Sequence, residues 1–462
     1  MNISIILAAG EGTRMKSKHS KVLHKLINKP MIKYVMDACD ECDVKKKVLI
    51  AGKNKNDLEE LFKDSDLVIK EQKIGPEFPY GTGYAVSLAL DEVKDDDSVL
   101  ILTGDAPLIR GETLKNFMDY HNEKSSVATV LTAVTDDTEG LGRIIKDDEG
   151  YFLKIVEHRD CTEEQLKIRE YNSGIMIING ASLKNSISKL DSDNDQGELY
   201  LTDIFQIIRE EGEKILTFQI PDEEEVHGIN SKLQLSEAEE VLRKRINEKY
   251  MLEGVVLENP SNIFIEDGVK IGRDTIIHSG AKIMGETTIG EDCVITGDST
   301  ICDSIIEDNV IIKSSVIEKS HVGEGTDIGP FAHLRPNSNL GKHVHIGNFV
   351  EVKNATVGNF TKAGHLAYVG DADLGEHINI GCGAIFVNYD GINKHRSKIE
   401  DQAFIGSNAN IVAPVHIGEK GFIAAGSTIT KDVSSGDLSI ERGQQANIPG
   451  WVKRREERNQ KK

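Results

Sequence analysis

The sequence lacks any long apolar run, since no stretch approaches about eighteen consecutive apolar residues, the least that a membrane-spanning helix needs. Its opening segment, MNISIILAAG, is apolar but has neither the basic leader nor the length of a secretory signal. We therefore expect a buried first strand there, no membrane association, and a cytoplasmic protein. With 39% hydrophobic and 28% charged residues over 462 positions, the composition predicts a globular chain of two domains.

Cysteine is scarce, with six in the chain, and only Cys39 and Cys42 form a C-x-x-C pair. One pair does not supply the four ligands of a structural zinc site, so reduced thiols are expected. Excess positive charge is also missing, because the net charge is −21. That balance argues against general nucleic-acid binding, and it means that anionic substrates need local clusters of Lys and Arg.

Short apolar runs alternate with helix-like segments over residues 1–228. Strands are predicted at 3–7, 48–51, 99–103 and 127–134, and helices at 31–42, 82–93 and 112–123. This alternation predicts an α/β domain of Rossmann-like type with a mostly parallel sheet, whose ligands bind beyond the carboxyl ends of the strands. A charged segment at 229–251 is expected to be a solvent-facing helical linker.

A six-residue period dominates residues 252–462, up to a basic C-terminal tail. It runs through three registers, Ile265 to Ile301, Val322 to Val352, and Ile399 to Ile429. The period fits neither an α-helix nor a two-faced strand, but it fits a parallel β-helix whose coils bury one aliphatic residue per side. The pattern breaks at 357–373 and 387–398, and both breaks are predicted to protrude and to build binding sites.

The segment LAAGEGTRM follows the first predicted strand. Gly10 and Gly12 allow close backbone approach, and Arg14 and Lys21 add positive charge, which together suit a polyanionic phosphate. A G-x-G after a strand is also typical of ordinary tight turns, and the G-K-[ST] ending of a P-loop is missing.

Longer matches decide between these readings. LAAGEGTRMKSKHSKVLH, YGTGYA, LTGDAPL, GLGRI, IVEHRD, YNSGI and GELYLTDI occur in the order typical of sugar-1-phosphate nucleotidyltransferases. FAHLRP, GNFVEVKNA, KAGHLAYVGD, INIGCG, VNYDG, IGSNA and IAAGS continue the match through the second half. The chain thus resembles the GlmU family of bifunctional N-acetylglucosamine-1-phosphate uridyltransferases and glucosamine-1-phosphate acetyltransferases, which implies a left-handed β-helix and a homotrimer with active sites between subunits.

The resemblance implies a uridylyl-transfer site in the first half, where N-acetylglucosamine-1-phosphate reacts with UTP and pyrophosphate leaves. Asp105 and Asn230 resemble the Mg²⁺ ligands, and Arg14 and Lys21 the groups that hold the triphosphate. The remaining positions line the nucleotide (Leu7, Ala8, Ala9, Gly10, Thr103 and Gly104), read the uracil (Gln72, Gly81 and Thr82), or form the sugar pocket (Gly142, Glu157 and Asn172).

The second half is implied to transfer acetyl from acetyl-CoA to glucosamine-1-phosphate, which needs a base for the amine proton. Residue types alone leave several histidines open (His333, His343, His345, His365 and His377), and the resemblance selects His365. Arg335 and Lys353 resemble the phosphate-binding pair. The remaining positions resemble sugar and acetyl contacts (Tyr368, Asn379, Asn388 and Tyr389) and coenzyme A contacts (Cys382, Ser407, Ala425 and Arg442).

The chain departs from the family pattern at several positions. Glu11 stands where many relatives carry Lys, Ser20 replaces a common Pro, the 73–80 segment is long, and Cys382 is expected to be a small wall of the acetyl-CoA site. Two alternatives remain open at this stage. One is a nucleotidyltransferase with a purely structural β-helix, and the other is a non-catalytic regulator built from the same modules.

Overall fold

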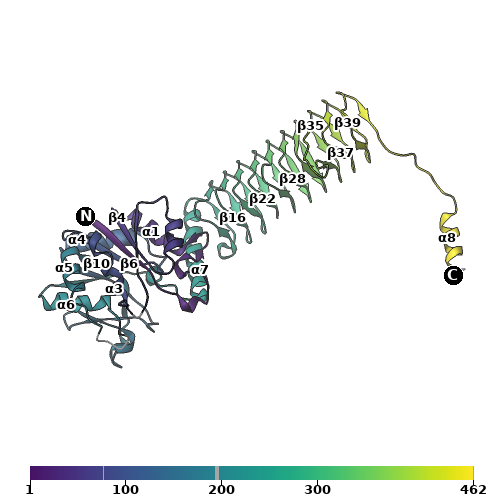
Figure 1. Cartoon of the computed structure of the whole chain (residues 1–462). Coiled ribbons are helices and arrows are strands. Elements are labelled where there is room, and N and C mark those ends of the chain that lie inside the picture. Colours follow the sequence, from purple (N-terminus) through teal and green to yellow (C-terminus); the bar gives the residue numbers. More distant parts are fainter. Residues whose placement is uncertain (76, 193–196, 461–462) are drawn as a thin grey trace. The chain divides into compact units, whose positions relative to one another are not determined.

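The computed structural model describes residues 1–75, 77–192 and 197–460, so one position of the long 73–80 segment lies outside the described residues. The chain divides into two compact units, Met1–Leu242 and Arg243–Lys462 (Figure 1). Each is described by itself.

A mixed nine-stranded sheet forms the centre of the N-terminal unit. Its order is β11-β7-β10-β6-β1-β4-β5, and β8 and β9 form a hairpin beside β10. The strands are β1 (Asn2–Ala8), β4 (Lys46–Ala51), β5 (Leu67–Glu71), β6 (Ser98–Thr103), β7 (Ala128–Val134), β8 (Arg143–Lys146), β9 (Phe152–Val156), β10 (Glu170–Asn179) and β11 (Ile215–Gln219). The β6-β1-β4-β5 half is parallel as predicted, whereas β10 runs antiparallel to both β6 and β7. A separate pair, β2 (Lys25–Leu26) and β3 (Lys29–Pro30), is antiparallel.

Helices cover both faces of this sheet. They are α1 (Met31–Glu41), α2 (Lys55–Leu61), α3 (Thr82–Ser87), α4 (Gly111–Glu123), α5 (Gly180–Ile187) and α6 (Ile204–Glu210). One core joins the sheet to α1 and α4 through Val35 and Phe117, and the other joins it to α3, α5 and α6 through Val86, Leu183 and Phe205. The helix predicted at 82–93 is shorter than expected, because α3 ends at Ser87 and a 3₁₀ turn, Leu90–Glu92, follows.

The strand order places two loops beside each other at one edge of the sheet. β1 and β6 are neighbours, with Leu7 opposite Thr103, and the Gly104 N–H donates to the Leu7 carbonyl (2.8 Å). A side chain at Gly104 would meet that carbonyl and the Ile32 side chain, so glycine allows the close approach. The predicted ligand loops therefore lie together.

A three-sided parallel β-helix forms the C-terminal unit (Figure 1). The first face contains β12 (Val256–Leu257), β15 (Ile276–Ile277), β18 (Val294–Ile295), β21 (Ile311–Ile312), β24 (Asp327–Ile328), β27 (His345–Asn348), β30 (Lys362–His365), β33 (Asn379–Ile380), β36 (Phe404–Ile405), β39 (Phe422–Ile423) and β41 (Leu438–Ser439). The second contains β13 (Phe264–Ile265), β16 (Lys282–Met284), β19 (Thr300–Cys302), β22 (Val316–Glu318), β25 (His333–Leu334), β28 (Glu351–Lys353), β31 (Tyr368–Gly370), β34 (Ile385–Val387), β37 (Asn410–Val412) and β40 (Thr428–Ile429). The third contains β14 (Lys270–Ile271), β17 (Thr288–Ile289), β20 (Ile305–Ile306), β23 (His321–Val322), β26 (Asn339–Leu340), β29 (Thr356–Val357), β32 (Ala372–Leu374), β35 (Ser397–Ile399) and β38 (His416–Ile417).

The first break in the hexad pattern does not protrude, contrary to the prediction. Residues 357–373 supply β30, β31 and most of β32, which stack in the regular coil. Ile346 pairs with Ala363, so this coil contains one residue fewer than the three hexads of a regular coil. The missing residue is omitted at a corner, and the strands stay paired. The second break does insert a loop between β34 and β35, which is closed by a bridge between Tyr389 and Lys394.

Adjacent residues on one strand of the coil differ sharply in burial. This difference allows a direct test of which residue of each hexad points into the core. Ile306 is 1% exposed in the core, whereas Ile305 on the same strand is 53% exposed. We expect Ile306→Ala to destabilise the β-helix by about 2–5 kcal/mol, because it removes buried methyl groups and leaves a cavity. Ile305→Ala is the matched control and should change the free energy of urea unfolding by less than about 0.5 kcal/mol. Equal effects of the two changes would contradict the assigned register.

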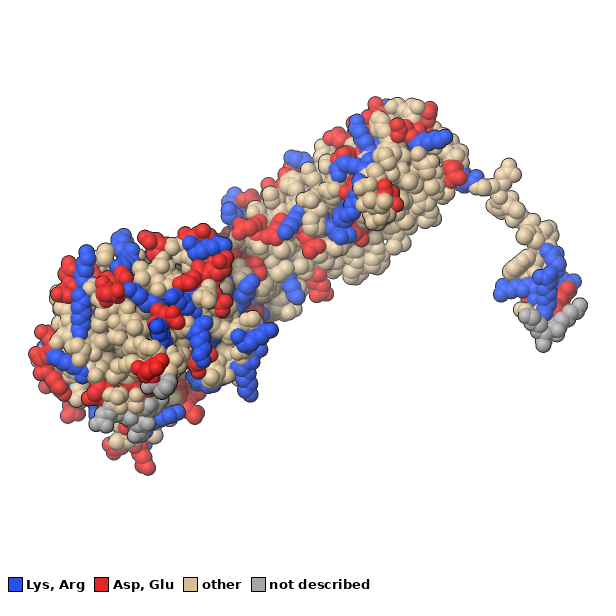
Figure 2. All heavy atoms as spheres, viewed as in Figure 1, with Lys and Arg blue, Asp and Glu red and all other residues tan. Residues whose placement is uncertain are grey.

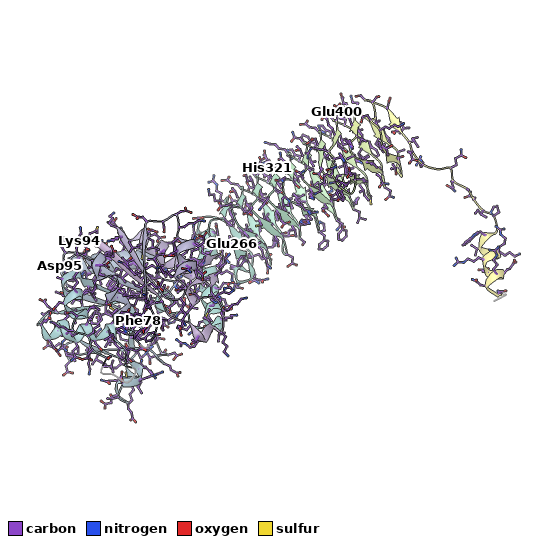
Figure 3. The ribbon with its side chains drawn as sticks, viewed as in Figure 1. Phe78, Lys94, Asp95, Glu266, His321 and Glu400 are labelled. Atoms are coloured by element: carbon purple, nitrogen blue, oxygen red, sulfur yellow. The ribbon has the colours of Figure 1, made fainter. Side chains whose placement is uncertain are left out.

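The outer surfaces of the three faces differ in polarity. The third face presents polar side chains in a row, and His321 there contacts Glu307 (3.0 Å) and Asn339 (3.0 Å). Figure 3 shows Glu266, His321 and Glu400 succeeding one another along the β-helix. Most exposed apolar side chains of the coils lie instead on the first and second faces and their shared corner (Val256, Ile311, Val316, Phe331, Phe349, Leu366, Ile385, Val387, Phe404, Phe422 and Leu438), whereas Ile305 lies on the third face and Phe360 at the corner between the third and first faces. The visible face of the β-helix accordingly has a strip with few charges, whereas both signs are interspersed over the N-terminal unit (Figure 2).

Two further helices complete the chain, α7 (Lys232–Leu252) and α8 (Trp451–Gln460). One side of α7 is packed rather than solvent-facing. In the N-terminal unit its Leu235 and Ala238 lie against Met31 and Ile229, and in the β-helix unit its Tyr250 hydroxyl donates to the Val269 carbonyl (2.5 Å). Every described residue of α8 is exposed. Among the described helices, none combines the length and apolarity that crossing a membrane requires.

Candidate active sites

In the N-terminal unit, the sequence predicts that Lys21, Asp105 and Asn230 act together, and the structure brings them into contact. The Lys21 Nζ donates to an Asp105 carboxylate oxygen and to Asn230 Oδ1 (3.0 Å). The Ile229 N–H donates to the Asp105 carbonyl (2.9 Å), which joins the two acceptors through the backbone. Oxygens more than a hundred residues apart in sequence thus converge on one cation.

This donor set fits a magnesium ion. A carboxylate oxygen and an amide oxygen are hard ligands, and Mg²⁺ in phosphoryl-transfer sites typically takes one or two protein ligands, with the remainder from phosphates and water. The described residues contain no cluster of three or more His, Cys, Asp or Glu side chains that could hold a metal. Two oxygens beside the loop after β1 therefore match Mg²⁺ better than a metal held entirely by protein.

The loop after β1 is shaped for close approach. Gly12 has φ +61°, and a Cβ there would lie 2.7 Å from the Lys21 Cβ, so glycine lets Lys21 reach the site. Glu11, the departure from the family pattern, forms an ion pair with Lys53, and both line a cavity of about 340 Å³ with Ala9, Gly10, Thr13, Ser17, Lys18, His19, Ser20, Asn54 and Asp57. Lys53, from the loop after β4, therefore offsets the negative charge of Glu11, and the pair brings no net positive charge to this loop. Arg14 lies in the following 3₁₀ turn, Thr13–Met15.

The positions assigned to uracil lie at the start of α3. Gly81 has φ +115°, and a Cβ there would lie 2.5 Å from the Leu199 carbonyl. The Leu201 N–H donates to the Thr82 hydroxyl (3.1 Å), so the start of the 3₁₀ turn Leu201–Asp203 holds this turn. Gln72 follows β5 and is buried, with its N–H donating to the Ala51 carbonyl (2.7 Å).

The positions assigned to the sugar lie where β8, β9 and β10 meet. The Asn172 N–H donates to the Gly142 carbonyl (2.8 Å), and a Cβ on Gly142 would lie within 3.5 Å of both Glu157 carboxylate oxygens. Burial is the largest cause that raises the pKa of Glu157, and the Thr202 hydroxyl, which donates to it (3.3 Å), acts in the opposite direction. These three positions therefore lie together, as the sugar assignment requires.

In the β-helix, His365 is distinguished from the other four histidines left open by residue type. His333 pairs with Glu318 and His345 with Asp327, while His343 and His377 stack on either side of Phe360. His365 is exposed at the end of β30, and within the described residues its side chain has no hydrogen-bond, ion-pair or ring partner. Its imidazole is free to accept a proton from a substrate.

The assigned coenzyme A residues form a line with His365. His365, Cys382, Ser407 and Ala425 each lie two residues after the buried residue of the first face, in four successive coils. Stacked strands are about 4.8 Å apart, so the line extends about 15 Å along the corner between the first and second faces. The Arg442 Nη1 donates to the Ala425 carbonyl (3.0 Å) at its end. Cys382 is exposed, and Tyr389 lies in the inserted loop.

The assigned sugar-phosphate residues lie on the second face. Arg335 pairs with Glu351 (2.8 Å), and Lys353 follows in the next coil. Contact with Lys394 is the largest cause that lowers the pKa of Lys353, so the inserted loop brings a second ammonium beside it. The sequence motifs did not identify Lys394, because no spacing rule links the inserted loop to β28.

Tyr368 and Asn388 complete this group. The Asn388 Nδ2 lies 3.3 Å from the Tyr368 hydroxyl. Asn379, in contrast, lies on the first face between Lys362 and Phe404. The assigned residues of one chain thus belong to two different faces.

The absence of a side chain at Gly370 leaves the space that the Tyr368 hydroxyl and the Asn388 amide occupy. A Cβ there would lie 2.4 Å from the Tyr368 hydroxyl and 2.8 Å from the Asn388 Nδ2. We expect Gly370→Ala to lower kcat/KM of acetyl transfer by at least about tenfold through this displacement. Gly443→Ala is the control, because a Cβ there meets no atom within 4 Å and Gly443 is not in the left-handed region. Uridylyl transfer by both variants should equal that of the parent, and an unchanged acetyl transfer rate for Gly370→Ala would contradict the assignment.

Comparison with known proteins follows the same division into two units. Residues 4–191 match the MobA-like NTP transferase domain, residues 265–364 the GMPPB C-terminal domain, and residues 396–431 six repeats of the bacterial transferase hexapeptide. The chain is 46% identical over 458 residues to the "Bifunctional protein GlmU" of Clostridioides difficile, covering 99% of this chain and 98% of that one. The chain belongs to the GlmU family.

Other GlmU relatives agree. Those of Clostridium novyi (46% identical, 97% of this chain and 98% of that one) and Caldanaerobacter subterraneus (45%, 98% and 98%) match over nearly their whole lengths. GlmU proteins are bifunctional uridyltransferases and acetyltransferases, and the NTP transferase and hexapeptide domains of this chain fit those two activities. The chain is therefore an enzyme with small-molecule substrates, and the resemblance read from its motifs is confirmed.

Proposed function

We propose that residues 1–228 carry the uridylyltransferase and residues 252–462 the acetyltransferase of this GlmU protein, joined by the helical linker at 229–251. The acetyltransferase converts glucosamine-1-phosphate, and its product is the acceptor for UTP. The observation that carries the proposal is that each unit assembles its own reactive group: Lys21, Asp105 and Asn230 in one, and the free His365 with its line of corner residues in the other.

Uridylyl transfer is in-line displacement at the α-phosphorus of UTP. A phosphate oxygen of N-acetylglucosamine-1-phosphate forms the new P–O bond as the bond to pyrophosphate breaks, so no protein nucleophile is needed. Asp105 and Asn230 would hold Mg²⁺, which neutralises the charge on the phosphates when bound. Lys21 and Arg14 hold the triphosphate, and the pocket of Gly142, Glu157 and Asn172 orients the acetylated sugar.

Acetyl transfer begins with the neutral amine of glucosamine-1-phosphate. Its nitrogen forms a C–N bond with the acetyl carbonyl carbon, the C–S bond of acetyl-CoA breaks, and His365 accepts the amine proton. The coenzyme A thiolate leaves and takes up a proton. Arg335 and Lys353 bind the sugar phosphate, while Ser407, Ala425 and Arg442 align the cofactor so that its thioester lies at the His365 end of the corner.

A homotrimer is the assembly that we propose for the β-helix. Contiguous exposed apolar surface is typical of a protein interface, and here most exposed apolar side chains lie on the first and second faces, while the third is polar apart from Ile305. A site that uses Asn379 on the first face with Tyr368 on the second is then completed between subunits. We place the trimer in the cytoplasm, where its phosphorylated substrates are found.

The mass in solution tests this assembly. Light scattering should give three times the 50.9 kDa of one chain. Phe349→Asp, at the apolar corner, should shift the protein to smaller species, because a charge would be buried at the interface. Ile305→Asp, equally exposed on the polar third face, should leave the trimer intact. Dissociation by both variants, or by neither, would argue against this surface.

The combined reaction tests the function. Purified protein is incubated with glucosamine-1-phosphate, acetyl-CoA, UTP and Mg²⁺, and free thiol and UDP-sugar are followed separately. We expect both signals, and UDP-sugar from pre-acetylated substrate without acetyl-CoA. UDP-sugar formed only from pre-acetylated substrate would leave a structural β-helix, and a folded protein that gives neither signal would favour a regulator.

A further inference from the structure

Asp371 is a buried acid beside the proposed acetyl-transfer site to which no role has been assigned. It is 7% exposed and lies at the corner between β31 and β32 with φ +49°. Burial of a carboxylate is costly unless hydrogen bonds replace its water. The groups that donate hydrogen bonds to the Asp371 carboxylate therefore indicate which side chains it holds in place.

Asp371 is the middle member of a ladder of three side chains. Asn354, Asp371 and Asn388 each lie two residues after the buried residue of the second face, in three successive coils. The Asn354 Nδ2 donates to Asp371 Oδ1 (2.5 Å), and the Asn388 Nδ2 donates to Asp371 Oδ2. The Asp371 N–H also donates to the Lys353 carbonyl (3.0 Å), and its own carbonyl accepts from the Ser397 N–H (3.1 Å).

The carboxylate decides how Asn388 is oriented. An ionised carboxylate only accepts hydrogen bonds, so Asn388 must turn its NH₂ group toward Asp371. The same Nδ2 lies 3.3 Å from the Tyr368 hydroxyl, which leaves the Asn388 Oδ1 as the acceptor for another group. With a neutral amide at position 371, either orientation of Asn388 would be allowed.

Asp371 also lies within a group of cations. It opposes the effect of Lys394, the main cause that lowers the pKa of Lys353, and it is one of the groups that raise the pKa of Arg396. The Arg396 Nη1 donates to the Asn354 carbonyl (2.8 Å), so the guanidinium lies at the same corner. One buried negative charge thus lies near Arg396 and near Lys353, which is one of the two cations proposed to bind the sugar phosphate, and it is the smallest of the effects named for Lys353.

We propose that Asp371 is a positioning residue for acetyl transfer, which orients Asn388 so that its Oδ1 accepts an N–H of the substrate amine. The inference rests on the proposed acetyltransferase site. The amine nitrogen then keeps its lone pair directed at the thioester carbon, and its other proton faces His365 across the proposed subunit interface, because His365 and Asn388 lie at opposite edges of the second face of one chain. In this proposal Asp371 contacts neither glucosamine-1-phosphate nor acetyl-CoA, and it affects the reaction only by orienting Asn388.

Steady-state kinetics of Asp371→Asn in the full chain test the proposal. The variant keeps the size of the side chain but removes the constraint on Asn388. We expect kcat of acetyl transfer to fall by about 10–100-fold, because misplacement of a reacting group on this scale costs that much. KM for glucosamine-1-phosphate should change less than threefold by the same argument, and uridylyl transfer from pre-acetylated substrate should equal that of the parent.

Asp373→Asn is the matched control. Asp373 lies two residues away and pairs with Arg396, so this change removes a carboxylate from the same corner without touching Asn388. It should leave kcat of acetyl transfer within about twofold of the parent, since it orients no reacting group. A loss equal to that of Asp371→Asn would show that charge alone matters, and would overturn the positioning role.

A double-mutant cycle separates positioning from a structural effect. If Asp371 acts through Asn388, then Asp371→Asn should add no further loss to Asn388→Ala, whereas independent effects would multiply. Multiplying losses, or an Asp371→Asn protein as active as the parent, would overturn the inference. If Asp371→Asn does not fold, Asp371→Ser undergoes the same cycle with the same expectation. A parent protein that releases no coenzyme A thiol would refute the acetyltransferase assignment itself, a result distinct from these.

Discussion

Asp105→Ala is expected to lower the rate of UDP-N-acetylglucosamine formation by at least about a hundredfold, while acetyl transfer continues at the parent rate. Asp105 is the only one of the three contacting groups that carries a negative charge, and its partners are the Lys21 ammonium and the Asn230 amide. Without it, Asn230 alone cannot hold a divalent cation against water, and Lys21 keeps only its contact with Asn230. Both effects leave the developing charge on pyrophosphate without its positioned counter-charge.

Separate assays of the two half-reactions make this result specific. UDP-sugar is measured from pre-acetylated substrate and UTP over a range of Mg²⁺ concentrations, and thiol release is measured with glucosamine-1-phosphate and acetyl-CoA. Asp95→Ala is the control, since Asp95 is an exposed carboxylate of the same unit that pairs with Lys184 (Figure 3). An Asp105→Ala enzyme with a normal rate and normal Mg²⁺ dependence would refute the assignment of Asp105 as a ligand.

The sequence predicted those features that depend on local periodicity. Strand–helix alternation located β1, β4, β6 and β7, and the hexads located the buried residues of the β-helix from Ile277 to Ile429. Both patterns reflect burial, which repeats with the geometry of the element. The antiparallel entry of β10 between β6 and β7 has no such local signal, because strand order depends on contacts far apart in sequence.

Protrusion of the 357–373 segment was predicted wrongly for a related reason. A missing residue interrupts the spacing of the hexads, but the coil omits it at the corner between the second and third faces, where Asn354 and Asp371, both with left-handed φ, turn the chain. The inward positions then resume as Ala363, Val369 and Leu374, all buried. A gap in the sequence pattern is therefore compatible with an unbroken stack.

Long-range polar contacts could not be predicted from sequence. Residue types alone left five histidines as candidate bases, and only the partners of the other four separate them from His365. Lys53 beside Glu11, Lys394 beside Lys353, and Asp371 between two asparagines are likewise brought together by the fold. Coil stacking turns a distance of seventeen residues into contact, which no short motif expresses.

His365→Ala is expected to lower kcat of acetyl transfer by about 10²–10⁴-fold, because the amine proton loses its acceptor in the transition state. KM for acetyl-CoA should stay near the parent value, since Ser407, Ala425 and Arg442 still line the corner beyond it. Uridylyl transfer should be unaffected, because it depends on Lys21, Asp105 and Asn230. The measurement is steady-state thiol release, with UDP-sugar formation from pre-acetylated substrate in parallel.

His333→Ala provides the matched control for this loss. His333 is a histidine of the same β-helix whose ring already contacts Glu318 (2.9 Å), so its removal breaks a surface pair without removing a free base. Its acetyl transfer should stay within about twofold of the parent, as expected for an exposed ion pair. If His365→Ala retains full activity while His333→Ala loses it, the base lies on the second face and the corner line from His365 to Ala425 does not carry the thioester. If only His365→Ala loses acetyl transfer, the imidazole at the end of β30 is the base, and the β-helix is catalytic and not only structural.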